Sequence, residues 1–166
     1  MTARPIRLFG DPILRSPTDP VDPSNERTAQ LVEDLLDTVR QPGRAGVAAN
    51  QIGVGLRAFS YNVDGEVGYI LNPVVDSVEG EREAIDEGCL SVPGVSFPRK
   101  RYPRATVSGV LLDGTPVTLS GEGLLAQALQ HECDHLDGHL YIEGLEPEVK
   151  REAMAAIRSS DWFQHA

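Results

Sequence analysis

Hydrophobic positions along the chain predict two amphipathic helices, one near each end. In the first, apolar residues recur every three to four positions, at Ala29, Leu31, Val32, Leu35, Leu36 and Val39. This pattern predicts a helix over about residues 25–40, with Ser24 as its N-cap and Pro42-Gly43 just after its end. Pro147 begins the second helix, which is expected to run to about Ser159 with Val149, Ala153, Met154 and Ile157 on one side.

Strand patterns and turn signals occupy the middle of the chain. Short apolar runs predict three strands, at residues 56–61, 68–71 and 73–78. Asp113-Gly114 lies between two alternating runs, which predicts a hairpin that pairs residues 105–111 with 115–119. Other segments are expected to be a proline-rich arm over residues 4–23, a solvated acidic connection over 79–86, a solvated basic loop over 99–104 and a short strand over 139–142.

A third helix is predicted in the last third of the chain. Residues that favour helices (Leu, Ala and Gln) make up most of the run Gly123–Leu129, and His131-Glu132-Cys133-Asp134-His135 follows closely. Ser120 is the expected N-cap of this helix, and Gly138 is its expected end. The patterns together predict an α+β fold in a single domain, residues 1–166, with small antiparallel β-sheets packed around this central helix. An N-terminal and a C-terminal helix complete it.

The His-Glu-x-x-His sequence on this helix indicates metal chemistry. Residues four apart share one face of a helix, so His131 and His135 can bind one metal ion while Glu132 lies beside a water on that ion. A chance occurrence of the pattern is the alternative interpretation. Two imidazoles do not complete a metal site, so a third ligand must come from elsewhere in the chain.

The residues that could supply a third ligand are Cys89, His139, His165 and carboxylates such as Glu143, Glu146, Glu148 and Glu152. A carboxylate ligand would indicate a zinc peptidase. Cys89 is favoured, because a thiolate binds zinc or ferrous iron strongly and Gly88 would let the backbone approach the helix closely. The alternative for Cys89 is a small buried hydrophobic side chain, the usual environment of a lone cysteine.

Composition and charge narrow the possible functions. The formal net charge of −10 and the aromatic content of 5% argue against nucleic-acid binding, which uses basic surfaces and aromatic stacking platforms. The two cysteines form no disulfide framework, and Cys133, two residues after His131, is expected to face the core. We find no run of about 18 apolar residues and no basic, apolar leader, so the expectation is a cytoplasmic protein without membrane association.

Three short segments together resemble the signature motifs of peptide deformylases, the metal hydrolases that remove the formyl group from nascent bacterial polypeptides. They are Gly46-Val47-Ala48-Ala49-Asn50-Gln51, Glu87-Gly88-Cys89-Leu90-Ser91 and His131-Glu132-Cys133-Asp134-His135. Their order and separations are similar to those of the family, and the resemblance covers nearly the whole chain. The first motif departs from the family pattern, because Arg44 replaces a glycine, Ala45 replaces a larger aliphatic residue and Val47 replaces leucine.

The resemblance implies a catalytic arrangement. Cys89, His131 and His135 would bind one divalent metal ion, Fe²⁺ by the family's preference, with Zn, Ni or Co as substitutes. Glu132 would act as general base toward a water on the metal, which attacks the formyl carbon. The side-chain amide of Gln51 and the backbone N–H of Leu90 would stabilise the oxyanion.

The resemblance also implies how the substrate binds. The expected substrate is the N-terminal formylmethionine of a newly made polypeptide, met at or near the ribosome exit. Its backbone would pair with Ala45-Gly46 and with Gly88-Cys89-Leu90. Its methionine side chain would enter a pocket that includes Ile85, Leu124, Ala128 and His131. The alternatives are a zinc peptidase that uses the same helix and a catalytically weak, deformylase-like protein that binds peptides.

Overall fold

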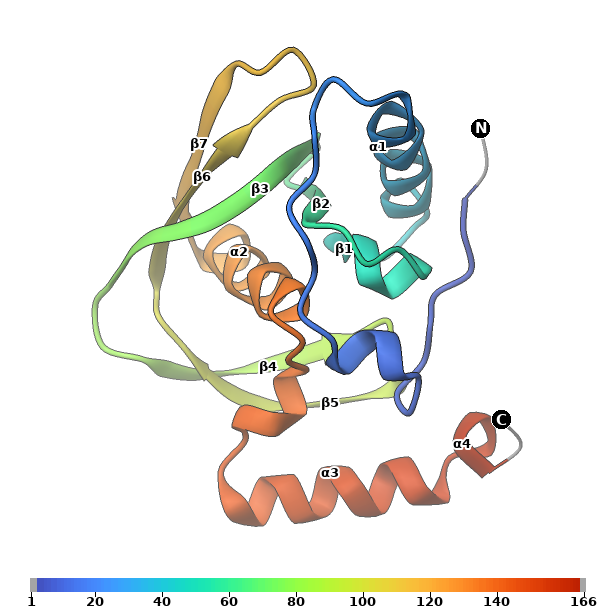
Figure 1. Ribbon diagram of the computed structural model, residues 1–166. Helices are drawn as coiled ribbons and strands as arrows, with labels where there is room; N and C mark the ends of the chain where they lie inside the picture. The colour runs from blue at the N-terminus through green and yellow to red at the C-terminus, as the bar shows by residue number, and fades with distance from the viewer. Residues whose placement is uncertain (1–2, 165–166) are drawn as a thin grey trace.

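The computed structural model describes residues 3–164 and shows an α+β fold (Figure 1). The helices are α1 (Glu26–Val39), α2 (Gly123–Leu136), α3 (Pro147–Ser159) and α4 (Asp161–Gln164), with 3-10 helices η1 (Pro12–Arg15), η2 (Ala49–Ile52) and η3 (Tyr141–Gly144). The strands are β1 (Gly46–Ala48), β2 (Ala58–Val63), β3 (Glu66–Glu79), β4 (Glu83–Cys89), β5 (Val92–Arg101), β6 (Arg104–Val110) and β7 (Pro116–Glu122). His165 lies outside the described residues.

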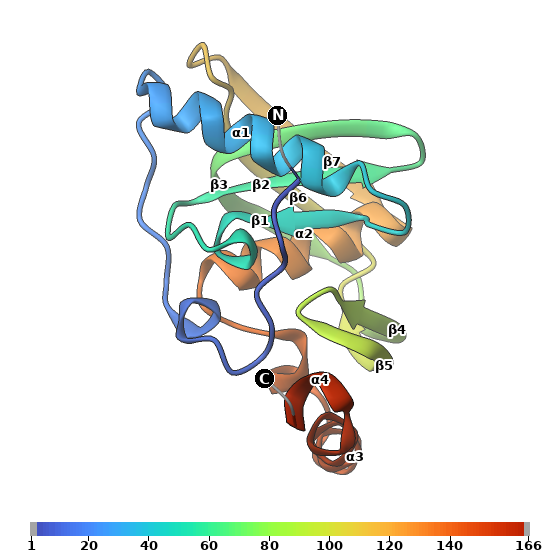
Figure 2. The same ribbon diagram turned by 90° about the vertical axis from the view of Figure 1, so that its right-hand side faces the viewer.

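Five strands form one antiparallel sheet in the order β1-β2-β3-β6-β7, and β4 pairs with β5 in a separate two-stranded sheet. Successive residues of the large sheet face opposite sides, as the pleat requires. Val47, Ala58 and Leu71 pack in one apolar cluster with α1, and their neighbours Ala48, Phe59 and Ile70 pack in another with α2. The sheet is therefore covered by one helix on each face (Figure 2).

Helix α2 lies between the five-stranded sheet and the β4–β5 sheet (Figure 2). Its Leu129, Cys133 and Leu136 face the large sheet, as predicted for Cys133. A third apolar cluster joins β5, η3 and α3. In Figure 1, α3 lies below the small sheet. The predicted fold class is therefore confirmed, including the central helix between sheets and the helices toward both ends.

The N-terminal arm is tied to the C-terminal end of α2. The backbone N–H and the hydroxyl of Thr18 both donate to the carbonyl of Leu136, at 2.9 and 2.8 Å. Gly138 follows the helix with φ +86°, a left-handed conformation that turns the chain away. An added Cβ at Gly138 would lie 2.9 Å from the carbonyl oxygen of Arg15. The arm can therefore pack against the end of the helix only because Gly138 has no side chain.

Three predicted strand boundaries are corrected by the structure. The runs 68–71 and 73–78 belong to the single strand β3, which continues through a register shift between Leu71 and Val74. Most of the acidic segment 79–86 is strand, because β3 extends to Glu79 and β4 begins at Glu83, which leaves only residues 80–82 as a connection. The side chains of the segment are exposed as expected, and residues 83–86 pair with β5.

Other local predictions are wrong where tertiary contacts prevail. Asn25, not Ser24, caps α1, with its side chain accepting from Arg27 N at 2.9 Å. Ser120 does not cap α2, because β7 stays paired with β6 up to Glu122. Residues 139–142 form no strand; Tyr141 and Ile142 begin η3 and pack in the cluster with α3. Within residues 3–164, no helix combines the length and apolar character needed to cross a bilayer.

Replacing Gly138 with alanine is expected to lower the free energy of unfolding by about 1–3 kcal/mol, because it combines left-handed strain with a contact to the backbone of Arg15. Urea denaturation would measure the loss. Gly114→Ala is the matched control, since Gly114 has a similar φ of +83° but open space around an added Cβ. Equal losses in both variants would contradict the contribution of the Arg15 contact.

Candidate metal centre and active-site cleft

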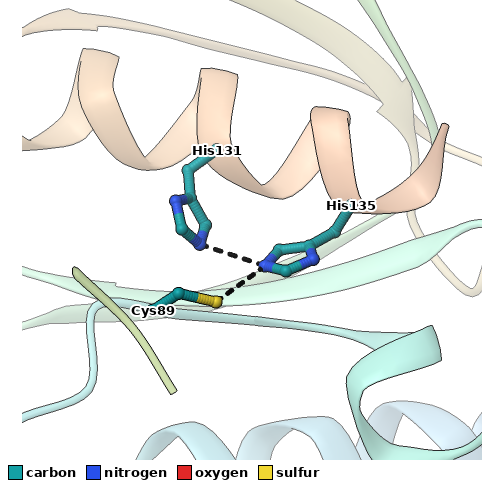
Figure 3. Close-up of side chains that lie close together, drawn as sticks. All are labelled: Cys89, His131 and His135. Carbon is teal, nitrogen blue, oxygen red and sulfur yellow. Dashed lines mark hydrogen bonds between the residues drawn. The ribbon is translucent and has the colours of Figure 1, made fainter. Parts of the chain in front are cut away.

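Cys89, His131 and His135 bring three metal-binding atoms to one point (Figure 3). The Nε2 atoms of His131 and His135 are 3.0 Å apart, and Cys89 Sγ lies 3.3 Å from His135 Nε2. In a tetrahedral site with bonds of about 2.0–2.3 Å, donor atoms lie roughly 3.3–3.6 Å from one another. The three donors therefore fit a single divalent ion, with the fourth coordination position available for water or substrate.

Local structure explains why these three side chains meet. Residues four apart lie one turn apart on a helix, so both histidines project from the same face of α2. Cys89 is the last residue of β4, and the β4–β5 pairing shifts register between Gly88 and Cys89. This irregularity ends the regular ladder at the residue that faces the two imidazoles.

A buried ion-pair network orients His131. Its Nδ1 lies 2.6 Å from Glu87 Oε2, which leaves Nε2 for the metal. Arg101 donates two hydrogen bonds to Glu87, at 2.8 and 2.6 Å, and a third to Asp134 at 2.6 Å. Burial alone would raise the pKa of Glu87, but Arg101 and His131 outweigh it and lower that pKa to about 2. Glu87 therefore stays ionised beside the ring.

Glu87 and Arg101 were missed by the sequence interpretation. The basic segment 99–104 was predicted to be a solvated loop, whereas β5 extends to Arg101 and the side chain of Arg101 is only 5% exposed. Asp134 reaches His131 only through Arg101 and Glu87. One signal was available for Glu87, which lies two residues before Cys89 and so shares its face of a strand.

Glu132 is buried at the edge of the same site. Only 3% of the residue is exposed, and its Oε1 has no hydrogen-bond partner among the described residues. An added Cβ at Gly46 would lie 2.6 Å from Glu132 Oε2, so β1 can pass this carboxylate only because Gly46 lacks a side chain. Burial raises the pKa of Glu132 to about 7, and a nearby divalent cation would favour its ionised form.

The side chain of Gln51 is held with its amide nitrogen toward Cys89. Its Oε1 accepts from the backbone N–H of Ala48 at 3.0 Å. Its Nε2 donates to Ser91 Oγ at 3.1 Å and lies 3.7 Å from Cys89 Sγ. Because the oxygen is bound by the backbone, the donor faces the metal-binding atoms. Ser91 therefore holds the side-chain amide of Gln51 in place.

A cleft of about 520 Å³ leads to these groups. Its lining includes most of the expected substrate-binding residues: Ala45, Gly46, Gly88, Leu124 and Ala128, together with Gln51, Cys89, Leu90, His131 and Glu132. Ile85 is not part of this lining, and its side chain is 38% exposed. Arg44 lines the cleft and donates from Nη1 to the carbonyl of Thr38 at 3.0 Å.

The other candidate ligands lie elsewhere. His139 is exposed and pairs with Glu143 at 3.0 Å, while Glu146, Glu148 and Glu152 are also exposed. Cys133 faces the sheet, and burial raises the pKa of its thiol to about 12, which disfavours a thiolate ligand. Among the described residues, only the cluster of Cys89, His131 and His135 can hold a metal ion.

Three side chains that could hold one metal ion, beside a buried carboxylate in a cleft, are the arrangement typical of metal-dependent hydrolases. The family model described as polypeptide deformylase matches residues 3–151. A peptide deformylase of Acidothermus cellulolyticus is 50% identical over 162 residues, which are 98% of this chain and 89% of that protein. The chain belongs to the peptide deformylase family, metal-dependent hydrolases that remove N-terminal formyl groups.

Solved structures agree with this assignment. A peptide deformylase from Legionella pneumophila has a TM-score of 0.90 and 35% identity, with 99% of this chain and 98% of that chain covered. A peptide deformylase from Synechococcus elongatus in complex with actinonin has a TM-score of 0.86 and 30% identity, with 95% and 87% covered. The fold that carries the site is therefore that of the family.

Replacing Glu87 with glutamine is expected to weaken metal binding about 10–100-fold, because the charged partner of His131 Nδ1 is lost. Competition with a chromogenic chelator would measure the affinity. Glu83→Gln is the control, since Glu83 is an exposed residue of the same strand. Unchanged metal affinity in Glu87→Gln would show that this contact does not support the ligand.

Proposed function

We propose that this chain hydrolyses the formyl group of N-terminal formylmethionine with Cys89, His131 and His135 as metal ligands and Glu132 as the group that moves the proton. The observation that carries the proposal is the convergence of the three ligand atoms, all within 4.8 Å of one another, beside the buried carboxylate of Glu132. The peptide cleft leads directly to them.

The reaction is the hydrolysis of an amide. When bound, a divalent ion at this site would polarise the formyl carbonyl and lower the pKa of a water. Glu132 accepts a proton from the attacking water and donates it to the nitrogen of the leaving amine, so that the bond between the formyl carbon and nitrogen breaks and formate is released. Its burial favours the protonated form reached in this exchange, because burial raises the pKa of the carboxyl, whereas a bound cation would favour the ionised form that accepts the proton.

Negative charge develops on the formyl oxygen during the attack. Gln51 supports its stabilisation, because Ala48 and Ser91 hold the side-chain amide with its N–H groups toward the ligand cluster. The backbone N–H of Leu90 is the second donor that we propose. Leu90 follows Cys89 directly and lines the same cleft.

The cleft walls suggest how the peptide lies. We propose that its backbone pairs with Ala45 and Gly46 of one wall and with Gly88 of the other, in the manner of an added strand. The methionine side chain then enters between Leu124, Ala128 and His131, where an apolar thioether finds mainly apolar partners. Gln127 Nε2 donates to the carbonyl of Asp86 at 3.0 Å, so this amide closes the rim between α2 and β4.

The donor set suits several ions, and we propose Fe²⁺ as the native one, with Zn, Ni or Co able to replace it. We further propose that the whole chain acts as one catalytic domain. Its substrates are newly made polypeptides met near the ribosome exit in the cytoplasm. The net charge of −10 is consistent with a peptide substrate and argues against direct binding of nucleic acid.

Formyl release from a formyl-Met peptide, with protein loaded anaerobically with Fe²⁺, Ni²⁺ or Zn²⁺, tests the proposal. Glu132→Gln should lower the rate about 10²–10⁴-fold while the metal content stays unchanged, because it removes the proton acceptor and no ligand. Glu122→Gln, at the exposed start of α2, is the control. The absence of release by every metal form of the natural protein would contradict the proposal and leave the alternatives of a zinc peptidase and a peptide-binding module.

Replacing Cys89 with alanine separates a deformylase from a zinc peptidase. A peptidase with a glutamate ligand would keep its metal, whereas we expect this variant to lose most of it, since one of three ligand atoms is gone. Elemental analysis after gel filtration would measure metal per chain. Cys133→Ala, which removes the buried cysteine of α2, should retain the metal. Full metal occupancy in Cys89→Ala would exclude the proposed ligand set.

A further inference from the structure

The turn that carries Cys89 also forms part of the cleft wall. We call residues 89–94 the cysteine turn; it comprises the last residue of β4, the connection Leu90-Ser91 and the first three residues of β5. Cys89, Leu90, Pro93 and Gly94 all line the cleft. On the cleft side, Gln51 Nε2 donates to Ser91 Oγ at 3.1 Å. A displacement of this turn would therefore move a ligand atom and the cleft wall together.

The two ends of the chain meet on the other side of the cysteine turn. The indole Nε1 of Trp162 donates to the carbonyl of Pro93 at 3.1 Å. The backbone N–H of Phe9 donates to the carbonyl of Ser91 at 2.8 Å. Figures 1 and 2 both place α4 and the N-terminal arm near the end of the β4–β5 sheet. Each end of the chain thus satisfies one carbonyl of the turn.

Aromatic packing joins the two ends to each other. The ring of Phe163 lies 5.9 Å from that of Phe9 and 5.9 Å from that of Trp162, distances typical of interacting aromatic pairs. Phe9 and Trp162 both pack against the apolar cluster that contains the fully buried Val92. The arm and α4 therefore hold the turn as one unit.

The match to the family model ends at residue 151, so Trp162 and Phe163 lie beyond it.

The cysteine turn has little regular strand pairing of its own. The β4–β5 ladder shifts register at Gly88 and Cys89, and Gly94 has a φ of +86°. Because strand pairing alone does not fix the position of the cysteine turn, contacts from outside the small sheet must fix it. Trp162 is suited to do so, because its ring packs against the apolar cluster that contains Val92 and its indole N–H donates to the backbone carbonyl of Pro93.

We propose that Trp162 is a positioning residue of the active site, which acts through Pro93 to hold the cysteine turn and with it the cleft wall and the metal ligand Cys89. The C-terminal segment is then a working part of the catalytic centre and not only a cover for the apolar cluster. The proposal rests on the ligand role of Cys89 and on the cleft assigned under the proposed function.

Trp162→Phe keeps an aromatic ring and removes the donor to Pro93, and Trp162→Ala removes both. Ile157→Val is the matched control, because it deletes one methyl group from the same apolar cluster without removing a hydrogen bond. Each protein is loaded with cobalt alone. Its absorption from the thiolate-to-metal and d–d transitions is recorded, and its melting temperature, KM and kcat for a formyl-Met peptide are measured.

Trp162→Phe is expected to lower kcat/KM about fivefold, as the loss of one neutral hydrogen bond would, mainly through a higher KM because Pro93 and Gly94 line the cleft. The cobalt bands should also shift, and both effects should be larger in Trp162→Ala. If Trp162→Ala fails to fold, Trp162→Phe decides. A change in either readout beyond that of Ile157→Val supports the proposal.

A lower melting temperature with unchanged cobalt bands and unchanged kcat/KM would overturn it, and Trp162 would be a structural anchor only. The failure of the proposed function is a separate result, seen as no formyl release by the natural protein. In that case the cobalt bands alone decide whether Trp162 positions Cys89.

Discussion

The orientation of His131 depends on a chain of charged groups buried between α2 and the β4–β5 sheet. Arg101 joins Glu87 to Asp134, and Glu87 contacts the imidazole. Removing charges from water costs several kcal/mol for each ion, so such a network is tolerated only when its hydrogen bonds are complete. The two bonds from Arg101 to Glu87 and the third to Asp134 meet this requirement. The same contacts therefore hold the small sheet against α2 and orient the imidazole of His131.

Two side chains with proposed catalytic roles, Glu132 and Gln51, lie at the site because small residues let backbones approach α2 closely. Gly46 places β1 directly against the carboxylate of Glu132. Ala48, the last residue of β1, donates its backbone N–H to the side-chain oxygen of Gln51, so that the amide nitrogen faces Cys89 and Ser91. A strand, a turn and a helix that are distant in sequence are thus fixed to one another by a few short contacts. These contacts hold the walls of the cleft in place beside the buried carboxylate of Glu132.

Much of the fold could be predicted because its elements follow local rules. The apolar spacing of α1 and α3 and the Asp113-Gly114 turn are properties of neighbouring residues, and the structure has these elements close to the expected places. The predicted secondary structure was wrong where pairing with a segment distant in sequence determines the backbone conformation. Residues 83–86 and 99–101 contain many charged residues, yet their backbones are paired as strands, because β4 and β5 satisfy each other's hydrogen bonds and leave most side chains to solvent.

By itself, the sequence determined the two histidines and the glutamate of α2, since helix geometry alone puts residues four apart on one face. Its motifs also indicated Cys89 and Gln51. Only the tertiary structure decided that Arg101 is buried and paired, that Glu87 orients His131, and that Trp162 reaches Pro93. The physical reason is that the burial of a charged or polar group depends on which partners surround it. Those partners lie on other elements, beyond the reach of local spacing rules.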